Sequence, residues 1–89
     1  MLKRENLRLG LIGIFIHDLN NSKKVNKLLN EYAEFIRGRF GVPLKQKKTG
    51  VISLIFEGST DIIGSLTGKL GQIKGVEVKT LLSKEEINE

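Results

Sequence analysis

The first apolar run of the chain, residues 8–17 (RLGLIGIFIH), most restricts the possible folds because nearly every position in it is apolar. Side chains of an extended strand point alternately to its two faces. Both faces of this run are therefore apolar, with Leu9, Leu11 and Phe15 on one and Ile12, Ile14 and Ile16 on the other. A single layer of helices covers only one face of a strand. We predict that the second face is covered by something else, most simply by another copy of the chain.

Residues 59–80 (STDIIGSLTGKLGQIKGVEVKT) predict a capped helix that leads directly into a strand. Residues 59–61 offer capping oxygens and a negative charge to the free N–H groups of the first turn. Apolar residues then recur at helical spacing, at Ile62, Ile63, Leu66, Leu70 and Ile73. Residues 74–75 favour a helix end with a left-handed glycine, and residues 76–80 alternate as a strand does.

Three glycines, Gly64, Gly68 and Gly71, lie within this predicted helix. Each costs roughly 1 kcal/mol relative to alanine in a helix interior, so their presence indicates that something approaches the helix backbone closely. Two interpretations remain open. If the glycines face the sheet, they let helix and sheet pack closely; otherwise they face another subunit or a ligand.

The rest of the chain supplies another helix and two more strands. Residues 22–37 combine an apolar stripe with a charged face and predict an amphipathic helix that ends before Gly38. An extended segment begins at residues 42–44, where proline favours a sheet edge or strand start. Residues 45–50 predict a hairpin loop, and residues 51–57 predict a strand with Val51, Ser53 and Ile55 on one face and Ile52, Leu54 and Phe56 on the other.

The resulting element order is β-α-β-β-α-β. Right-handed crossovers turn this order into an α+β, ferredoxin-like fold, a four-stranded antiparallel sheet with two helices on one face. The 89 residues suffice for one domain, residues 1–89, in which residues 1–7 and 83–89 are expected to fray. The apolar run near the N-terminus is too short to span a membrane and lacks a cleavage site after it, so we expect a cytoplasmic protein.

The sequence offers little for catalysis or for metal binding. It has no cysteine, and His17 is its only histidine, whereas a metal site needs three or four ligands and a general base needs a partner group. Neither a phosphate-binding loop nor a dinucleotide or hydrolase motif is present. We expect no enzymatic activity, no metal and no cofactor, although a symmetric oligomer could duplicate His17 and Asp18 into a site.

Nucleic acid is an alternative partner because fifteen basic and ten acidic residues give a net charge of +5. The basic residues concerned are Lys45, Lys47 and Lys48 in the predicted loop and Lys23, Lys24 and Lys27 on the first predicted helix. RNA-recognition motifs share the βαββαβ order, but their third strand carries aromatic residues that stack on bases. Residues 49–54 are glycine, aliphatic or hydroxyl residues instead, so we expect nucleic acid to be the less favoured partner.

Residues 61–79 read DIIGSLTGKLGQIKGVEVK. They follow the pattern of an acidic residue and then I-G-[AS]-L-[ST]-G-K-L-G-x-[IL]-x-G-V-x-V-K. In this pattern the chain resembles the small ACT-like proteins of the iron-only hydrogenase system regulator family, and the order of strands and helices extends the resemblance over residues 8–82. The resemblance implies an ACT-like ferredoxin fold, a homo-oligomer (dimer or tetramer) and a regulatory role.

ACT domains commonly bind amino acids at a subunit interface, through the turn after the first strand and a neighbouring helix. That turn is here residues 17–21, without the glycine often found there. The candidate ligand-binding residues are His17, Asp18, Asn20, Asn21, Gly64, Gly68 and Gly71, and the candidate interface residues are Leu9, Leu11, Phe15, Val51 and Ile55. We therefore predict a homo-oligomeric, non-catalytic sensor module in transcriptional or metabolic regulation, with a small-molecule effector or a protein partner.

Overall fold

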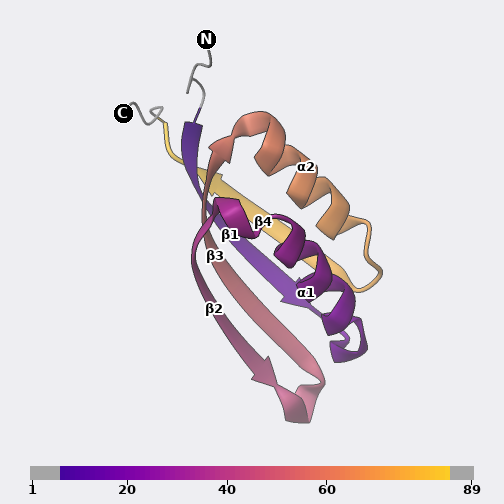
Figure 1. The fold of residues 1–89 in the computed structure, drawn as a ribbon. Helices are drawn as coiled ribbons and strands as arrows, with labels where there is room; N and C mark the ends of the chain where they lie inside the picture. The colour runs from indigo at the N-terminus through magenta and orange to yellow at the C-terminus, as the bar shows by residue number, and fades with distance from the viewer. Residues whose placement is uncertain (1–6, 85–89) are drawn as a thin grey trace.

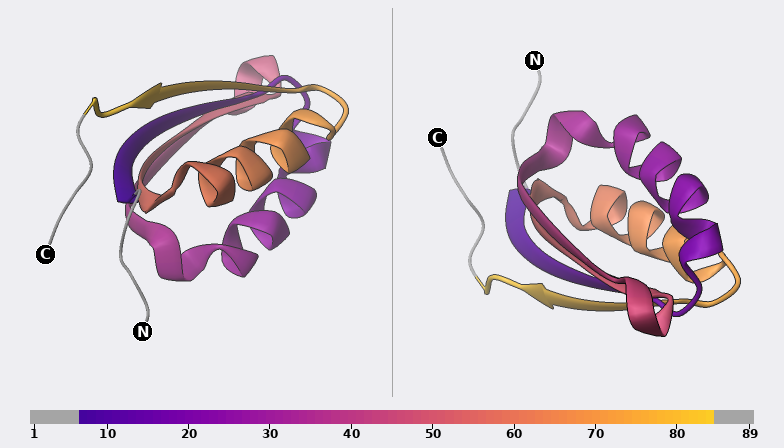
Figure 2. Two further views of the ribbon diagram at one scale, coloured as in Figure 1. Left: turned by 90° about the horizontal axis from the view of Figure 1, so that it is seen from above. Right: turned by 90° about the horizontal axis from the view of Figure 1, so that it is seen from below.

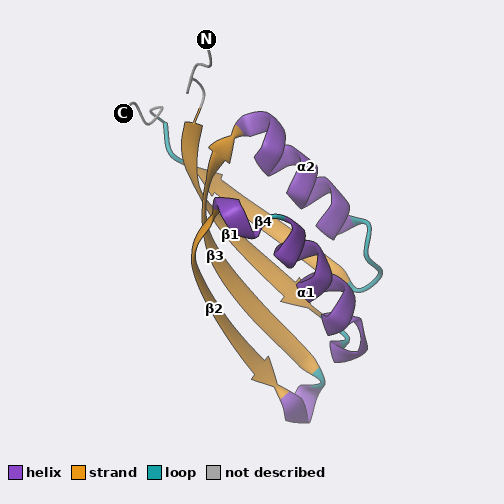
Figure 3. Ribbon diagram, in the orientation of Figure 1, coloured by secondary structure: helices purple, strands orange, loops and turns teal. Residues whose placement is uncertain are grey.

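A computed structural model of the chain describes residues 7–84. Its main elements are β1 (Leu7–Ile16), α1 (Ser22–Glu31), β2 (Ile36–Leu44), β3 (Thr49–Ser59), α2 (Thr60–Gly71) and β4 (Val76–Leu82). Figures 1 and 3 show that the strands form one sheet, in the order β2-β3-β1-β4, and every neighbouring pair is antiparallel. The predicted ferredoxin-like βαββαβ fold is confirmed.

Both helices cover the same face of a curved sheet, and the other face carries no element of the described residues, as Figure 2 shows. Between helices and sheet lies one core of buried side chains, which are Ile12, Ile14, Ile16, Val25, Leu29, Ile52, Leu54, Phe56, Ile63, Leu66 and Leu70. Burying one such side chain contributes about 1.5–3 kcal/mol. The inner faces predicted for the first and third strands are therefore the faces that form this core.

The first helix is shorter than predicted. It ends at Glu31 rather than near Arg37, and a 3₁₀ turn, Ala33–Phe35, leads into β2 at Ile36. The ring of Phe35 stacks on the core ring of Phe56 with 5.7 Å between centroids, which draws this segment towards the sheet. The glycines after Ile36 disfavour a helix, and pairing with β3 gives the backbone of residues 36–44 its hydrogen bonds.

The hairpin between β2 and β3 is also tighter than predicted. The strands continue to Leu44 and resume at Thr49, so that only a 3₁₀ turn, Lys45–Lys47, and the left-handed Lys48 (φ 55°) separate them. The N–H of Leu19 donates to the carbonyl of Lys48 at 3.0 Å. This bond holds the end of the hairpin beside the start of α1. As Pro43 indicated, β2 is an edge strand.

The predicted cap of α2 is confirmed. The hydroxyl of Ser59 accepts a hydrogen bond from the N–H of Ile62 at 3.1 Å, which satisfies one of the free donors of the first turn. The helix ends at Gly71, slightly earlier than expected, and the chain reaches β4 through Gly75 in the left-handed conformation (φ 77°). The prediction of a left-handed glycine at this position is also confirmed.

The interpretation that the three glycines of α2 face the sheet is wrong. A Cβ atom added at Gly64, Gly68 or Gly71 would meet nothing within 4 Å, and all three residues are exposed. With 3.6 residues per turn, these positions lie on the side of the helix opposite the buried Ile63, Leu66 and Leu70. The glycines therefore form a flat outer stripe, which we call the glycine stripe.

Replacing Gly75 by alanine should destabilise the fold by about 1–2 kcal/mol, because an L-residue disfavours the left-handed conformation. The new Cβ would also lie 3.4 Å from Nδ2 of Asn21. Urea unfolding measures the effect, with Gly75→Asn as the matched variant, since asparagine tolerates positive φ better than alanine does. An unchanged midpoint for Gly75→Ala would contradict this account of the turn.

The ends that we expected to fray lie largely outside the described residues, which leave out residues 1–6 and 85–89. Leu7 belongs to β1, and the N–H of Ser83 donates to the carbonyl of Leu9 at 2.9 Å. Within residues 7–84, neither helix has the length and apolar character required to cross a membrane.

Candidate functional site

The face of the sheet that turns away from both helices is rich in apolar side chains, and we call it the open face. Strand register places on it Leu9, Leu11 and Phe15 of β1, Phe40, Val42 and Leu44 of β2, Val51 and Ile55 of β3, and Leu81 of β4. All five candidate interface residues thus lie on one surface. The side chains of Phe40 and Leu81 are 71% and 69% exposed, values that leave most of two large apolar groups in water.

The open face is slightly hollowed and has few charges. A depression of about 290 Å³ lies where Leu9, Leu11, Ile55 and Leu81 meet. Among the described residues of this face, Glu57 accepts a hydrogen bond from Nε of Arg37 at 2.8 Å, and Nζ of Lys79 lies 3.6 Å from a carboxylate oxygen of Glu77. The acidic groups of the open face are therefore already paired, and most of its other side chains are apolar, with Ser53 of β3 among them. Monomeric proteins seldom expose large continuous surfaces of this kind.

Sequence reasoning missed the part of this surface that β2 contributes. Phe40 was not assigned to any element, because the first helix was predicted to continue to residue 37 and the next strand to begin at residue 42. The signal was nevertheless present, since Phe40, Val42 and Leu44 alternate with a period of two, as the exposed face of a strand does.

The turn after β1, which carries the predicted ligand residues His17, Asp18, Asn20 and Asn21, is fixed by its own hydrogen bonds. The carboxylate of Asp18 accepts from the N–H of Asn20 at 3.0 Å. The N–H of His17 donates to the carbonyl of Gly75 at 2.7 Å, and Nδ2 of Asn21 donates to the carbonyl of Lys74 at 2.6 Å. These bonds connect the turn after β1 to the turn before β4. Several polar groups of the turn after β1 therefore already form hydrogen bonds within the fold.

The side chain of His17 lies close to an acidic side chain of β4. Its Nε2 lies 3.3 Å from a carboxylate oxygen of Glu77, and both side chains are at least half exposed. An ion pair in this setting contributes little stability. No group of three or more potential metal ligands occurs within residues 7–84.

The glycine stripe and the turn after β1 do not form one compact site. The C-terminal end of α2 lies near this turn, and the helix runs away from it towards its N-terminus, as Figure 1 shows. At 1.5 Å per residue, Gly64 lies about 10 Å further along the helix than Gly71. Of the three glycines, Gly71 is therefore the one placed nearest the turn.

A polar contact joins the two helices beside the glycine stripe. The hydroxyls of Tyr32 and Ser65 share a hydrogen bond of 2.8 Å, and Nζ of Lys69 lies 5.4 Å from the centre of the Tyr32 ring. The hydrogen bond with Ser65, followed by the interaction with Lys69, lowers the pKa of Tyr32. Sequence reasoning placed Tyr32 in the apolar stripe and did not identify this contact.

The lysines considered for nucleic acid lie towards one end of the molecule. Lys45, Lys47 and Lys48 are exposed in the turn of the β2–β3 hairpin, and Lys23, Lys24 and Lys27 are exposed on α1. The bond between Leu19 and Lys48 brings that turn next to the start of α1. On the open face, the two aromatic side chains come from β1 and β2, not from the third strand.

Two solved structures of low sequence identity share the fold of this chain. The C-terminal domain of the MgtC protein from Mycobacterium tuberculosis is 12% identical, covers 99% of this chain and 100% of its own, and has a TM-score of 0.68. The apo form of CPII, a nitrogen regulatory PII-like protein from Thiomonas intermedia K12, is 15% identical, covers 86% of this chain and 94% of its own, and has a TM-score of 0.51. Comparison with curated proteins gives no match.

A closer relation is found with one solved structure and one family model. The uncharacterized protein TM1266 from Thermotoga maritima is 38% identical, covers 88% of this chain and 99% of its own, and has a TM-score of 0.82. Residues 8–80 match the model of the TM1266-like family, whose description provisionally assigns it as an iron-only hydrogenase system regulator. The match includes both helices, all of β2 and β3, and most of β1 and β4. The chain therefore belongs to the TM1266-like family.

Proposed function

We propose that this chain is a non-catalytic, cytoplasmic regulatory module that associates with itself through the open face. The observation that carries the proposal is the continuous apolar surface on all four strands, with Phe40 and Leu81 the most exposed members. At about 25 cal/mol per Å² of apolar surface removed from water, covering such a surface supplies a substantial driving force for association.

A second copy of the chain is the partner that this surface suits best. A twofold interface brings the same patch of both subunits together, so the apolar side chains of one copy meet those of the other. The paired charges of Glu57 and Glu77 lie on the same face and leave no unbalanced acidic group to repel the equivalent group of the other copy. A chain of 89 residues also gains more from oligomerisation than a larger domain does.

We propose further that a small molecule or a partner protein acts on this assembly, in the transcriptional or metabolic control of a hydrogenase system. The family description supports the assignment of a hydrogenase system as the system that is regulated. The turn of His17, Asp18, Asn20 and Asn21 and the outward glycine stripe remain candidate contacts for the effector. A role in nucleic-acid binding has less support, because the uncovered face of the sheet is apolar while the lysines lie in the hairpin turn and on α1.

Native mass spectrometry of the full chain, purified without added ligand, tests this proposal. We expect a dimer or tetramer that persists on dilution into the low micromolar range. A reproducible additional small mass would support a bound effector, and an oligomer without extra mass would favour a protein partner. A monomer at every concentration, confirmed by sedimentation velocity, would refute association through the open face.

A further inference from the structure

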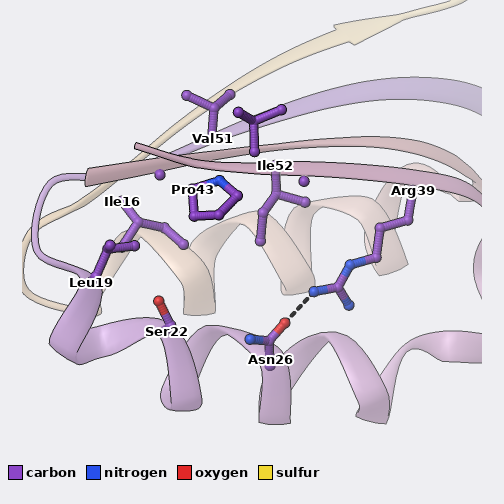
Figure 4. Close-up of a pocket in the computed structure, with 11 residues that line it drawn as sticks. Ile16, Leu19, Ser22, Asn26, Arg39, Pro43, Val51 and Ile52 are labelled. Atoms are coloured by element: carbon purple, nitrogen blue, oxygen red, sulfur yellow. Dashed lines mark hydrogen bonds between the residues drawn. The ribbon is translucent and has the colours of Figure 1, made fainter. Parts of the chain in front are cut away.

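On the opposite side of the sheet from the open face, a cavity of about 240 Å³ lies between the first half of α1 and the β2–β3 hairpin (Figure 4). Two glycines on the inner side of this hairpin help to form it. Gly41 pairs with Ile52 and leaves the space that a side chain would occupy, whereas Gly50 pairs with Pro43 and lets the side chain of Leu19 lie against its backbone. None of the candidate ligand or interface residues except Val51 lines this cavity.

The walls of the cavity divide into an apolar part and a polar part. Ile16 and Ile52 project from the sheet, and Leu19 and Pro43 close the end nearest the hairpin turn. Ser22 and Asn26 rise from α1, and the guanidinium of Arg39 bends from β2 towards Asn26, as Figure 4 shows. A ligand that fits must therefore have an apolar body and one polar end.

A positive charge lies at the polar end of the cavity. Among the residues that the structure describes, Arg39 is the only charged one that lines the cavity. Its guanidinium donates a hydrogen bond to Oδ1 of Asn26, which orients the group at the rim. A guanidinium has five N–H donors, so one such bond leaves others for an anionic ligand. No carboxylate of the described residues lines the cavity, so an ammonium group on the ligand would find no oppositely charged partner among them.

We propose that this cavity binds a small aliphatic carboxylate that lacks an α-amino group, with its carboxylate on Arg39 and its tail on the apolar wall. At about 30 Å³ for each atom, as for water in the liquid, the volume admits about eight non-hydrogen atoms. A branched acid of six carbons, such as 4-methylpentanoate, has this size. The role of this cavity as an effector site rests on the proposed regulatory function. Binding of the acid can be measured whether or not that function is correct.

Titration of the ¹⁵N-labelled full chain with 4-methylpentanoate, followed by NMR, tests the proposal. We expect saturable shifts that are largest at residues lining the cavity. The uncharged 4-methylpentanamide and leucine should each bind at least about tenfold more weakly, because the first lacks the charge that Arg39 pairs with and the second carries an ammonium without an oppositely charged partner. Equal binding of either compound, or stronger binding of inorganic phosphate, would overturn the assignment.

Two substitutions test the contributions of the polar and the apolar part of the cavity separately. Arg39→Gln removes the charge, and Gly41→Val fills the space; a Cβ at Gly41 meets no atom closer than 3.7 Å, so the fold should tolerate it. Each substitution should weaken the binding of 4-methylpentanoate at least about tenfold. The matched control Lys45→Gln removes a charge from the hairpin turn outside the cavity and should leave binding unchanged. Unchanged binding in both cavity variants, with wild-type thermal stability, would refute the site.

A variant that cannot associate distinguishes this inference from the proposed function. Ile55 does not line the cavity, so Ile55→Asp on the open face should bind 4-methylpentanoate with the wild-type affinity. Loss of binding in that variant would show that the site is incomplete in one chain and would overturn the inference, whatever the wild-type oligomeric state proves to be.

Discussion

Replacing Ile55 by aspartate should turn the assembly into monomers. Ile55 lies on β3, in the middle of the open face, and pairs with Leu11 of β1 on one side and Gly38 of β2 on the other. An interface across this face would bury the new carboxylate without a partner. Leaving a buried charge unpaired costs about 3 kcal/mol or more, which weakens association at least about a hundredfold. Sedimentation velocity over a dilution series measures the change.

The matched control places the same charge on the same sheet outside the open face. Thr80 is exposed on β4 and pairs with the core residue Ile12, so it points to the helix side. Thr80→Asp should keep the wild-type oligomeric state. If Thr80→Asp dissociates the assembly as well, or if Ile55→Asp leaves it intact while retaining the wild-type circular dichroism spectrum, the open face is not the interface.

The sequence was sufficient to predict the fold because its strongest patterns are local. Alternation in β1 and β3 separated the inner from the outer side chains, and the Ser59 cap and Gly75 marked the limits of the α2 region. The start of β2 was not predicted correctly, because Tyr32 and Ile36 continue the helical spacing of α1. The helix ends because of two tertiary contacts, which are the stacking of Phe35 on Phe56 and the pairing of the following residues with β3.

The candidate sites were harder to predict than the fold, because they combine residues from several helices and strands. The cavity behind the β2–β3 hairpin forms where Leu19 and residues of α1 meet three strands, so the role of Arg39 becomes visible only when Asn26 lies beside it. The orientation of the glycine stripe, by contrast, was contained in the sequence. Gly64, Gly68 and Gly71 are spaced on the side of the helix opposite the apolar residues, and a helical projection would have assigned them to the surface.

Replacing all three glycines of the stripe by alanine should stabilise the protein by about 2–3 kcal/mol, because each glycine costs up to about 1 kcal/mol in a helix and nothing within 4 Å opposes the added methyl group. For a domain of this size the gain corresponds to a rise in Tm of about 10–20 °C. Differential scanning calorimetry measures it. Had the glycines packed against the sheet, the same substitutions would instead be destabilising.

Two other glycines provide the controls for that experiment. A Cβ at Gly58 would lie 3.0 Å from the ring of Phe56, and one at Gly50 would lie 3.1 Å from the side chain of Leu19. Gly58→Ala and Gly50→Ala should therefore lower Tm. If the triple variant gains stability but loses its oligomeric state or its response to an effector, the glycine stripe is a contact surface whose cost in helix stability is offset by binding. If it gains stability and retains both, the open face is sufficient for association.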